Sequence, residues 1–262
     1  MKRLSTVLLF LCLLGAAVAA RAQQPHLYAV IDYMHIPDDQ SAQDYIALEK
    51  LWQRLHQKAV DAGICHGWYM NRVENGGRND FVTIRVYASL TNIAAPWPDA
   101  LIKGLFTSQE EAQMMKTAQV RQLTHSELWE VEASAMKNLE GQSPRYQEID
   151  FMKPKPGKAG DYFKMETEIW SKLHKARVDA GLMDGWFFLS RMFPSGYDSD
   201  YDFITVNIFA DKAASEKSFD SELAQKALSA EDLTKVTATL DLRSIVRREI
   251  WHSRLQAVPS KK

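Results

Sequence analysis

The chain contains the same residue pattern twice in tandem, and this repeat constrains its fold more than any other feature of the sequence. The first copy begins at Tyr28–Met34 and the second at Tyr146–Met152, an offset of 118 residues. A chain of this kind is expected to fold as two copies of one supersecondary unit. At the same offset the residues Trp52, Leu55, His56, Val60, Asp61, Ala62 and Gly63 recur as Trp170, Leu173, His174, Val178, Asp179, Ala180 and Gly181.

The second copy is longer than the first at one place. The segment Asp80–Ile84 returns as Asp202–Val206, so the offset rises from 118 to 122 residues, and four residues were gained. A loop between two strands tolerates such a length change, whereas a packed strand does not. Gly76-Gly77 and Pro194-Ser195-Gly196 supply turn residues there. The larger offset also relates Arg121, Glu127 and Trp129 to Arg243, Glu249 and Trp251.

The predicted elements follow the same order in both copies. In the first copy, leucines at helical spacing indicate the first helix, and Gly63 is a typical residue to end it. Strands are predicted near residues 28–35, 68–73, 81–88 and 126–131, and helices near 44–62 and 108–122. This β-α-β-β-α-β order is the ferredoxin-like, split βαβ motif. We therefore predict an α+β fold with ferredoxin-like halves at residues 23–134 and 146–257 and a linker at 135–145.

The first residues have the pattern of a secretory signal peptide. Lys2 and Arg3 precede an apolar run from Val7 to Leu14, and a series of alanines up to Ala22 offers cleavage positions. The apolar run is shorter than the ~20 residues that a membrane-spanning helix needs. We therefore expect residues 1–22 to be removed. The mature protein would then be periplasmic or secreted, with no membrane segment.

Composition narrows the functional classes. The formal net charge is −1, so the chain lacks the basic excess that is typical of nucleic-acid-binding proteins. Signal cleavage would leave Cys65 as the one cysteine, which excludes a disulfide framework and a cysteine-based metal site. The sequence contains no phosphate-binding loop, nucleophile elbow or dinucleotide-binding motif. We expect no metal and no cofactor, and a small organic molecule as partner rather than nucleic acid.

Alternation along the strands assigns their side chains to two faces. In the third strand of each copy, one face is aliphatic and the other mixes aromatic and polar groups. We predict that the aliphatic face packs under the helices, and that the mixed faces of the two sheets close against each other around a shared cavity. In the first copy the mixed face consists of Phe81, Thr83, Arg85 and Tyr87, and in the second of Phe203, Thr205, Asn207 and Phe209.

The order of elements and the tandem duplication resemble the dimeric α/β-barrel superfamily, which includes antibiotic-biosynthesis-type monooxygenases and NIPSNAP-like proteins. The resemblance covers essentially the whole mature chain. It implies that the two ferredoxin-like halves form one intramolecular barrel. Activities in that superfamily range from cofactor-free oxygenation and haem chemistry to lyase and isomerase reactions and plain ligand binding. The resemblance therefore predicts a fold but does not fix a function.

Acidic residues that occur in both copies are the first candidates for the cavity. Carboxylates enclosed together in a barrel can have raised pKa values and can act as acids or bases. The alternative, which we favour, is that they form ion pairs that stabilise the barrel. The candidate acids are Asp32, Glu127, Asp150 and Glu249, and the arginines available to pair with them are Arg85, Arg121 and Arg243.

Arg85 and Asn207 occupy equivalent positions, so the two copies differ on the predicted inward face. A ligand site would explain this difference. Arg85 would then bind a carboxylate or enolate oxygen, with Thr83, Thr205 and Asn207 as neutral hydrogen-bonding neighbours. Equally consistent is a single buried ion pair of Arg85 with Asp32 or Glu127.

The first helix of each copy adds three candidates. His56 and His174 each follow a tryptophan by four residues, so each lies on a helix stripe with that ring. We expect interface histidines hydrogen-bonded to backbone, with catalysis or haem ligation as the minor alternative. Glu166 aligns with Leu48 when the helices are matched without a gap. It is either a cavity residue or a sign that the second helix begins later than predicted.

Together these patterns predict an exported α/β-barrel protein that binds a small molecule of unspecified structure. Cofactor-independent, oxygenase-like chemistry on an oxidisable or enolisable compound would extend that role. The alternative is a non-catalytic exported protein that serves as a structural or protein-interaction module. A spacious polar cavity would favour the first prediction. The second would be favoured by a cavity filled with the aromatic rings of Phe81, Tyr87, Phe203 and Phe209.

Overall fold

The computed structural model describes residues 26–75, 79–137, 146–196, 199–216 and 221–259. The predicted signal peptide, residues 1–22, and residues 138–145 of the predicted linker lie outside these ranges. The strands of the first half are β1 (Leu27–His35), β2 (Gly67–Asn75), β3 (Phe81–Tyr87) and β4 (Gln122–Met136). Those of the second half are β5 (Tyr146–Pro154), β6 (Gly185–Phe193), β7 (Phe203–Phe209) and β8 (Arg243–Ala257).

The helices follow the predicted order, although the second helical region of each half consists of short pieces. The first half contains α2 (Ala42–Asp61), α3 (Leu90–Ala94), α4 (Asp99–Ile102), α5 (Ser108–Met114) and α6 (Thr117–Val120). The second half contains α7 (Ala159–Lys164), the π-helix η1 (Met165–Trp170), α8 (Ser171–Asp179), α9 (Lys212–Ser215), α10 (Ser221–Ala227), α11 (Ala230–Thr237) and α12 (Thr239–Leu242). The predicted α+β class and the β-α-β-β-α-β order of both halves are confirmed.

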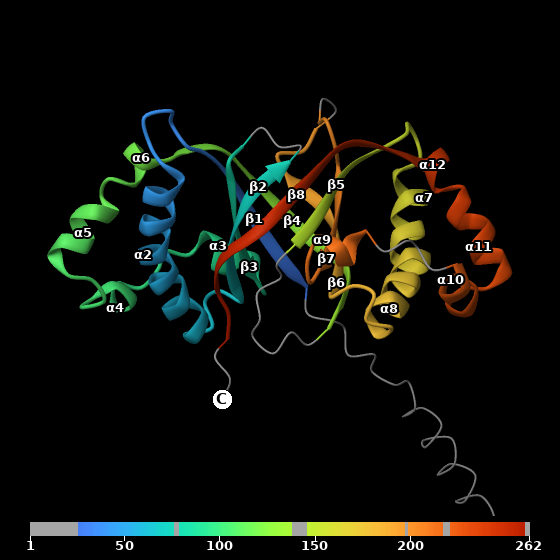
Figure 1. Cartoon of the computed structure of the whole chain (residues 1–262), viewed down its shortest axis with the longest axis horizontal. Helices are drawn as coiled ribbons and strands as arrows, with labels where there is room; N and C mark the ends of the chain where they lie inside the picture. Colours follow the sequence, from blue (N-terminus) through green and yellow to red (C-terminus); the bar gives the residue numbers. More distant parts are fainter. Residues whose placement is uncertain (1–25, 76–78, 138–145, 197–198, 217–220, 260–262) are drawn as a thin grey trace, which may run out of the picture.

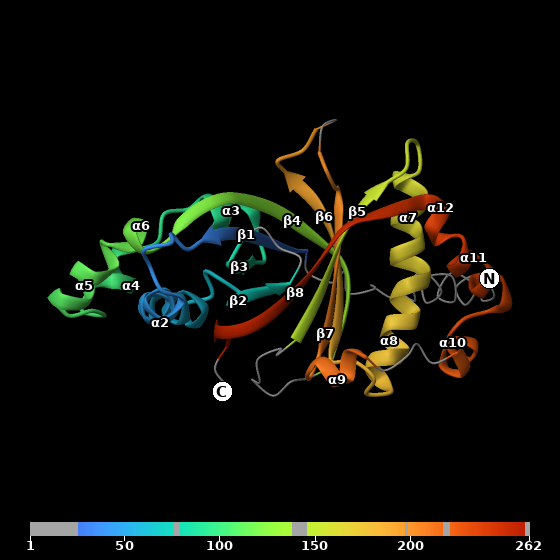
Figure 2. The same cartoon turned by 45° about the horizontal axis from the view of Figure 1, so that its top comes forward.

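The eight strands form one closed antiparallel barrel in the order β1-β3-β2-β8-β5-β7-β6-β4. Each half contributes four neighbouring strands, and the pairs β2·β8 and β4·β6 join the two sheets. Each strand therefore lies opposite its counterpart, β1 facing β5 and β4 facing β8. The helices of the two halves lie on opposite flanks of the barrel (Figures 1 and 2). The predicted intramolecular barrel is confirmed.

Helix α2 begins and ends where its local sequence dictates. The Ser41 side chain accepts a hydrogen bond from the Asp44 backbone N–H at 3.0 Å, which caps the first turn. Beyond the last turn Gly63 has a φ of +71°, a conformation that residues with a side chain rarely adopt. Between these ends one stripe of α2 is buried against the sheet, including Tyr45, Leu48 and Leu55.

The matching helix of the second half contains one extra residue, and η1 accommodates it. In the first part of this helix, as far as Glu166, equivalent residues of the two halves are 117 positions apart, as are Tyr45 and Tyr162. From Trp170 onward they are 118 positions apart. A π-helical turn inserts one residue without rotating the rest of the helix out of register. Glu166 is therefore the counterpart of Glu49 rather than of Leu48. The helix begins at Ala159, so of the two alternatives for Glu166 a late helix start is not the one observed.

The assignment of strand faces was wrong, because the two faces are exchanged relative to the prediction. Val82 and Ile84 point into the barrel, where they pack with residues of both halves such as Tyr33 and Ile149. Phe81 and Tyr87 instead pack under α2, in a cluster with Tyr45 and Trp68. The second half shows the same exchange, since Ile204, Val206 and Ile208 belong to the interior cluster and Phe203 and Phe209 to the layer beneath its helices.

The geometry of the barrel explains this exchange. An eight-stranded barrel is just wide enough for side chains to fill its interior. Branched aliphatic residues and a few rings fill that space here, including the fully buried Trp129 and Trp251. The layer between a sheet and its helices receives the polar residues of the third strands, where Arg85 binds Asp32 of the neighbouring strand. The four rings whose presence in a central cavity would have favoured the non-catalytic alternative lie in these outer layers instead.

Candidate functional site

The polar residues under α2 surround a cavity of about 350 Å³ between this helix and the first sheet. We call it the layer cavity. Its size lies within the range of small-molecule pockets. Three tryptophans, a methionine and a leucine form the apolar part of its wall, and polar or charged side chains form the rest. The lining residues are Asp32, Met34, Glu49, Trp52, His56, Trp68, Thr83, Arg85, Trp97, Arg121, Leu123 and Ser126.

Glu49 is the most deeply buried acid of the layer cavity. It lies on α2, its relative exposure is 2%, and one carboxylate oxygen accepts a hydrogen bond from Arg121 Nε at 3.1 Å. Burial raises the pKa of Glu49 to about 7, against the opposing influence of Arg121 and the Tyr45 hydroxyl. A carboxyl group with a pKa near neutrality exchanges a proton readily under physiological conditions. Glu49 is therefore the group of the cavity best suited to general acid–base chemistry.

His56 lies about two turns further along α2, between two tryptophan rings. Its imidazole stacks on Trp68 with a centroid distance of 4.9 Å, and Trp97 meets it edge-on at 5.0 Å. Burial lowers the pKa of His56 to about 3, so the ring is neutral at physiological pH. Among the described residues its Nδ1 has no hydrogen-bond partner. The expected backbone hydrogen bond is thus not formed at this atom.

Asp32, Thr83 and Arg85 lie together at the sheet side of the layer cavity. Arg85 Nη2 donates a hydrogen bond to Asp32 at 2.7 Å, and the Ser126 hydroxyl donates to the other carboxylate oxygen at 2.6 Å. The ion-pair alternative for Arg85 is therefore the one observed, with Asp32 rather than Glu127 as partner. This pair fixes the position of the guanidinium group at the cavity wall.

The second half repeats the acids of this layer, but its aspartate has a partner on a different strand. Asp150 is bound by Arg248 of β8, whose Nη2 lies 3.1 Å from a carboxylate oxygen. Glu166 is 3% exposed, and burial raises its pKa to about 7 although Tyr162 and Arg243 lower it. His174 stacks on Trp186 at 4.8 Å, and burial lowers its pKa to about 3. Thr205 and Asn207 belong to the same layer of this half, by alternation with the inward-pointing Val206.

The predicted residues are thus divided among three places, and the prediction that they line one interior was wrong. The first-half group of Asp32, His56, Thr83 and Arg85 lines the layer cavity. The second-half group of Asp150, Glu166, His174, Thr205 and Asn207 lies on the equivalent side of the other sheet. The barrel interior receives Glu127, which accepts a hydrogen bond from Trp129, and Glu249, which accepts one from Trp251.

Sequence reasoning missed the residues that complete these clusters. Glu49 was not matched with Glu166, because an alignment without gaps does not allow for the one-residue insertion in η1. Arg248 was not considered although it is paired in register with Asp150. An alignment of the two halves that allowed one single-residue gap inside the second helix would have matched Glu49 with Glu166. It would also have matched the tyrosine and the arginine beside each glutamate.

The charged groups of the layer cavity are suited to acid–base chemistry. Within the described ranges, no group of three or more histidine, cysteine, aspartate or glutamate side chains is arranged to hold a metal ion. The described helices also include none that is both long enough and apolar enough to cross a membrane. The chemistry that this site offers is a proton acceptor with a pKa near neutrality, Glu49, in a cavity that also contains a neutral imidazole and tryptophan rings.

Comparison with protein-family models and with curated protein sequences gives no match. Solved structures match over most of the chain. A putative monooxygenase of Fusobacterium nucleatum shares 10% sequence identity, and the superposition covers 90% of this chain and 95% of that one with a TM-score of 0.56. A second such protein, of Lactobacillus acidophilus, shares 11% identity over 90% of this chain and 97% of its own, with a TM-score of 0.51. The chain therefore has the dimeric α/β-barrel fold, with both ferredoxin-like halves in one polypeptide.

Proposed function

We propose that this protein binds a small, largely aromatic organic molecule in the layer cavity and that Glu49 removes a proton from it. The observation that carries the proposal is a deeply buried carboxylate with a pKa of about 7 in the wall of a cavity of about 350 Å³. Such a base is poised near the operating pH, which is where general-base catalysis is most effective. Trp52, Trp68 and Trp97 offer flat apolar surface for a ring system.

Two further groups of the cavity support binding of an enolisable or phenolic compound. His56 is neutral and lines the cavity, so its imidazole offers an uncharged ring surface to the ligand. Arg121 lies beside Glu49 and can stabilise the oxygen anion that forms when the substrate loses its proton. The site thus contains an acceptor for the proton and a cation for the charge left behind.

The proposed reaction needs dioxygen as co-substrate and no bound cofactor. Deprotonation of an activated CH₂ group gives an enolate, which is electron-rich enough to react with O₂. One oxygen atom then becomes the new carbonyl oxygen, and the other leaves as water with the two hydrogens of the CH₂ group. The four electrons lost by the carbon reduce the O₂ molecule, so the step balances. The two solved structures named above are both of putative monooxygenases, which is compatible with this chemistry.

Export is part of the proposal and rests on the amino-terminal sequence. Lys2 and Arg3, the apolar run after them and the alanines before Arg21 have the order of a cleavable signal. The expected mature protein begins near Arg21 or Gln23. Amino-terminal sequencing of the protein recovered from the periplasm or medium tests this, and recovery of intact Met1 in the membrane fraction would contradict it.

A second candidate is a non-catalytic protein in which the buried acids only stabilise the fold. It is favoured by one observation, namely that a tyrosine, a glutamate and an arginine occur together in both halves. A duplicated cluster is what a structural network would leave after gene duplication. The duplication also supplies a matched control, because Glu166 shares the burial and pKa of Glu49.

The experiment compares Glu49→Gln with Glu166→Gln, using anthrone as the probe because its CH₂ group readily forms an enolate. Binding is followed by quenching of tryptophan fluorescence, and turnover by oxygen uptake. We expect both variants to bind anthrone and Glu49→Gln alone to lose oxygen uptake, by roughly 10²–10⁴-fold. Wild-type protein that neither binds anthrone nor consumes oxygen with it, or equal rates in all three proteins, would favour the structural candidate. An absorption spectrum of the purified protein checks that no haem is present.

A further inference from the structure

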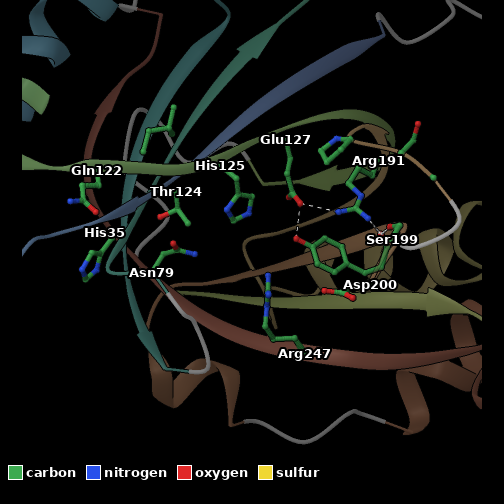
Figure 3. Close-up of a pocket in the computed structure, with 15 residues that line it drawn as sticks. His35, Asn79, Gln122, Thr124, His125, Glu127, Arg191, Ser199, Asp200 and Arg247 are labelled. Carbon is green, nitrogen blue, oxygen red and sulfur yellow. Dashed lines mark hydrogen bonds and ion pairs between the residues drawn. The ribbon is translucent and has the colours of Figure 1, made fainter.

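A second cavity lies outside the layer just discussed. It has a volume of about 980 Å³ and opens at the end of the barrel where β4 and β8 begin (Figure 3). We call it the barrel mouth. Its walls come from both halves, because β4 and β8 lie opposite each other in the strand order. A ligand here would therefore contact both halves of the chain at once.

The floor of the barrel mouth is closed by a saturated ion pair. Glu127 accepts hydrogen bonds from Tyr33, Trp129, Tyr201 and Arg191, at distances between 2.6 and 3.2 Å. Arg191 also donates to the backbone carbonyl of Tyr201, and its side chain is only 7% exposed. Because every strong donor and acceptor of this cluster already has a partner, the cluster serves as a rigid base rather than as a ligand contact.

Arg247 differs from Arg191 in that its outer end is free. Its Nε lies 2.8 Å from Glu249, and its guanidinium plane lies over the Phe151 ring at 3.9 Å. Neither terminal nitrogen donates a hydrogen bond to any described residue, and the side chain is 26% exposed toward the mouth. In Figure 3 the guanidinium group points into the cavity. Stacking and the Nε contact hold the group in place, so its two terminal donors form a preorganised fork.

His125 faces the same space from the opposite wall (Figure 3). It occupies the position on β4 that Arg247 occupies on β8, and it stacks on Tyr33 with a centroid distance of 4.2 Å. Burial lowers the pKa of His125, so the imidazole is neutral at physiological pH. Among the described residues it has no hydrogen-bond partner, and Thr124, Gln122 and Asn79 add neutral polar groups beside it.

The geometry points to a second binding site, in which the barrel mouth takes a small organic carboxylate whose oxygens bind the terminal nitrogens of Arg247 while its body contacts His125. A guanidinium fork matches the two oxygens of a carboxylate, which a single ammonium group does not. The neutral imidazole would bind a hydroxyl or carbonyl group of the same molecule. An aromatic or hydroxylated acid fits, because stacked rings and neutral polar groups line the remaining wall.

The acids near the mouth do not cancel this preference. Glu127 is neutralised by Arg191, and burial raises the pKa of Glu249, which weakens its hold on the charge of Arg247. Asp200 lies at the exposed rim, where water screens it. The site is independent of the layer cavity, because the two cavities lie on opposite faces of the first sheet and share only Leu123.

The test is a titration of the full mature chain with sodium benzoate, followed by calorimetry and by the histidine ring signals in NMR spectra. Benzamide, which has the same shape without the charge, is the matched ligand control. The variants are Arg247→Gln and Arg248→Gln, the second being the next residue on β8, which points to the helix side and binds Asp150. Thermal melting checks that each variant is folded.

We expect saturable binding of benzoate that shifts the His125 ring signals, weakens at least about tenfold in Arg247→Gln and is unchanged in Arg248→Gln. Benzamide should bind more weakly than benzoate to the wild type. Lack of saturable benzoate binding, or equal binding by Arg247→Gln, would overturn the proposal. If Arg247→Gln does not fold, the histidine ring signals of the wild type test the proposal instead. A benzoate-induced shift that is confined to histidines other than His125 would also overturn it. A benzoate-induced shift at His125 and not at His56, which lines the layer cavity, separates binding at the barrel mouth from binding in the layer cavity.

Discussion

Each half contains an equivalent aspartate that pairs with an arginine, but the two arginines lie on different strands. In the first half Arg85 of β3 binds Asp32, and Ser126 of β4 completes the contact. In the second half Asn207 occupies the position of Arg85, and Asp150 is bound instead by Arg248 of β8. Arg248 is the register partner of Asp150, whereas Arg85 lies two residues beyond Thr83, the register partner of Asp32 on β3. Either neighbouring strand can therefore supply the cation. What is kept after duplication is therefore the ion pair and not the residue that makes it.

The buried glutamates give the opposite lesson. Here the residues are the same in both halves, but the helix around them has changed. Glu49 lies in a regular α-helix, whereas Glu166 is kept at the equivalent place by the π-helical turn η1. Both are nearly inaccessible, and both have a pKa of about 7. The layer thus retains this acid even at the cost of an irregular helix.

The largest predicted effect concerns the pH dependence of these two glutamates. Each has a pKa of about 7 in the folded chain and ~4.3 in the unfolded chain, so between these values the folded state binds more protons. Their contribution to the free energy of unfolding is therefore greatest below about pH 4.3 and declines as the pH rises to about 7. Glutamine resembles the protonated carboxyl and has no such dependence.

We therefore expect Glu49→Gln and Glu166→Gln each to gain stability relative to the wild type between about pH 4.3 and 7, by on the order of 3 kcal/mol. Urea unfolding at a series of pH values measures this difference. His56 and His174 contribute with the opposite pH dependence, but they are present in the wild type and in the variants, so their contributions cancel in the difference. If the free energy of unfolding of the wild type instead rises relative to that of the variants as the pH increases, Arg121 or Arg243 keeps the glutamate charged. An effect at one site alone would show that the halves are not equivalent.

The second prediction exchanges the arginine position of one half for that of the other. Arg85→Asn should destabilise the first half by roughly 1–2 kcal/mol, less than a fully buried pair because the Arg85 side chain is 31% exposed. Adding Ser126→Arg to this variant recreates the arrangement of the second half around Asp32 and should recover most of the loss. Chemical denaturation of the two single variants and the double variant gives the coupling energy.

Ser126→Arg alone is the control, because a second arginine beside an occupied aspartate should give no gain. Additive effects of the two substitutions would contradict the interpretation that β3 and β4 are interchangeable sources of the cation. They would also reopen a ligand-binding role for Arg85 itself.

The sequence predicted the fold because the repeat and its periodicity are local signals. The offset of 118 residues, the change to 122 at one hairpin and Gly63 after the first helix all follow from the order of residues along the chain. Strand alternation also correctly grouped Thr83 with Arg85, and Val82 with Ile84. The closure of the sheets then followed from the presence of two faces that each need burial.

The candidate site was predicted less well because alternation shows which residues share a face but not which face turns inward. Both faces of these sheets are buried, so hydrophobicity does not distinguish them. The barrel mouth could have been found more easily. His125 and Arg247 are each two residues before a glutamate that was correctly predicted to point inward, so the same parity places them inward as well.

The smallest predicted effect tests the role of η1. Deletion of Thr167 would place every residue of the second helix 117 positions after its counterpart in α2. The helix could then form without a π-helical turn, as α2 does. The Thr167 side chain hydrogen-bonds only to the Phe163 carbonyl of its own helix, and the buried stripe of Met165, Glu166 and Ile169 keeps its neighbours. We expect the free energy of unfolding to change by less than about 1 kcal/mol.

The matched control is deletion of Lys50, an exposed residue at the corresponding place in α2. No π-helical turn is present there to lose, so the deletion rotates the following turns by about 100° and moves Trp52 and His56 away from the sheet. Thermal melting and circular dichroism of both variants make the comparison. If the Thr167 deletion unfolds the chain as the Lys50 deletion should, then η1 is not a simple insertion, and the equivalence of Glu49 and Glu166 requires another explanation. If both deletions are tolerated, the buried stripe of α2 fixes the helix less firmly than its contacts indicate.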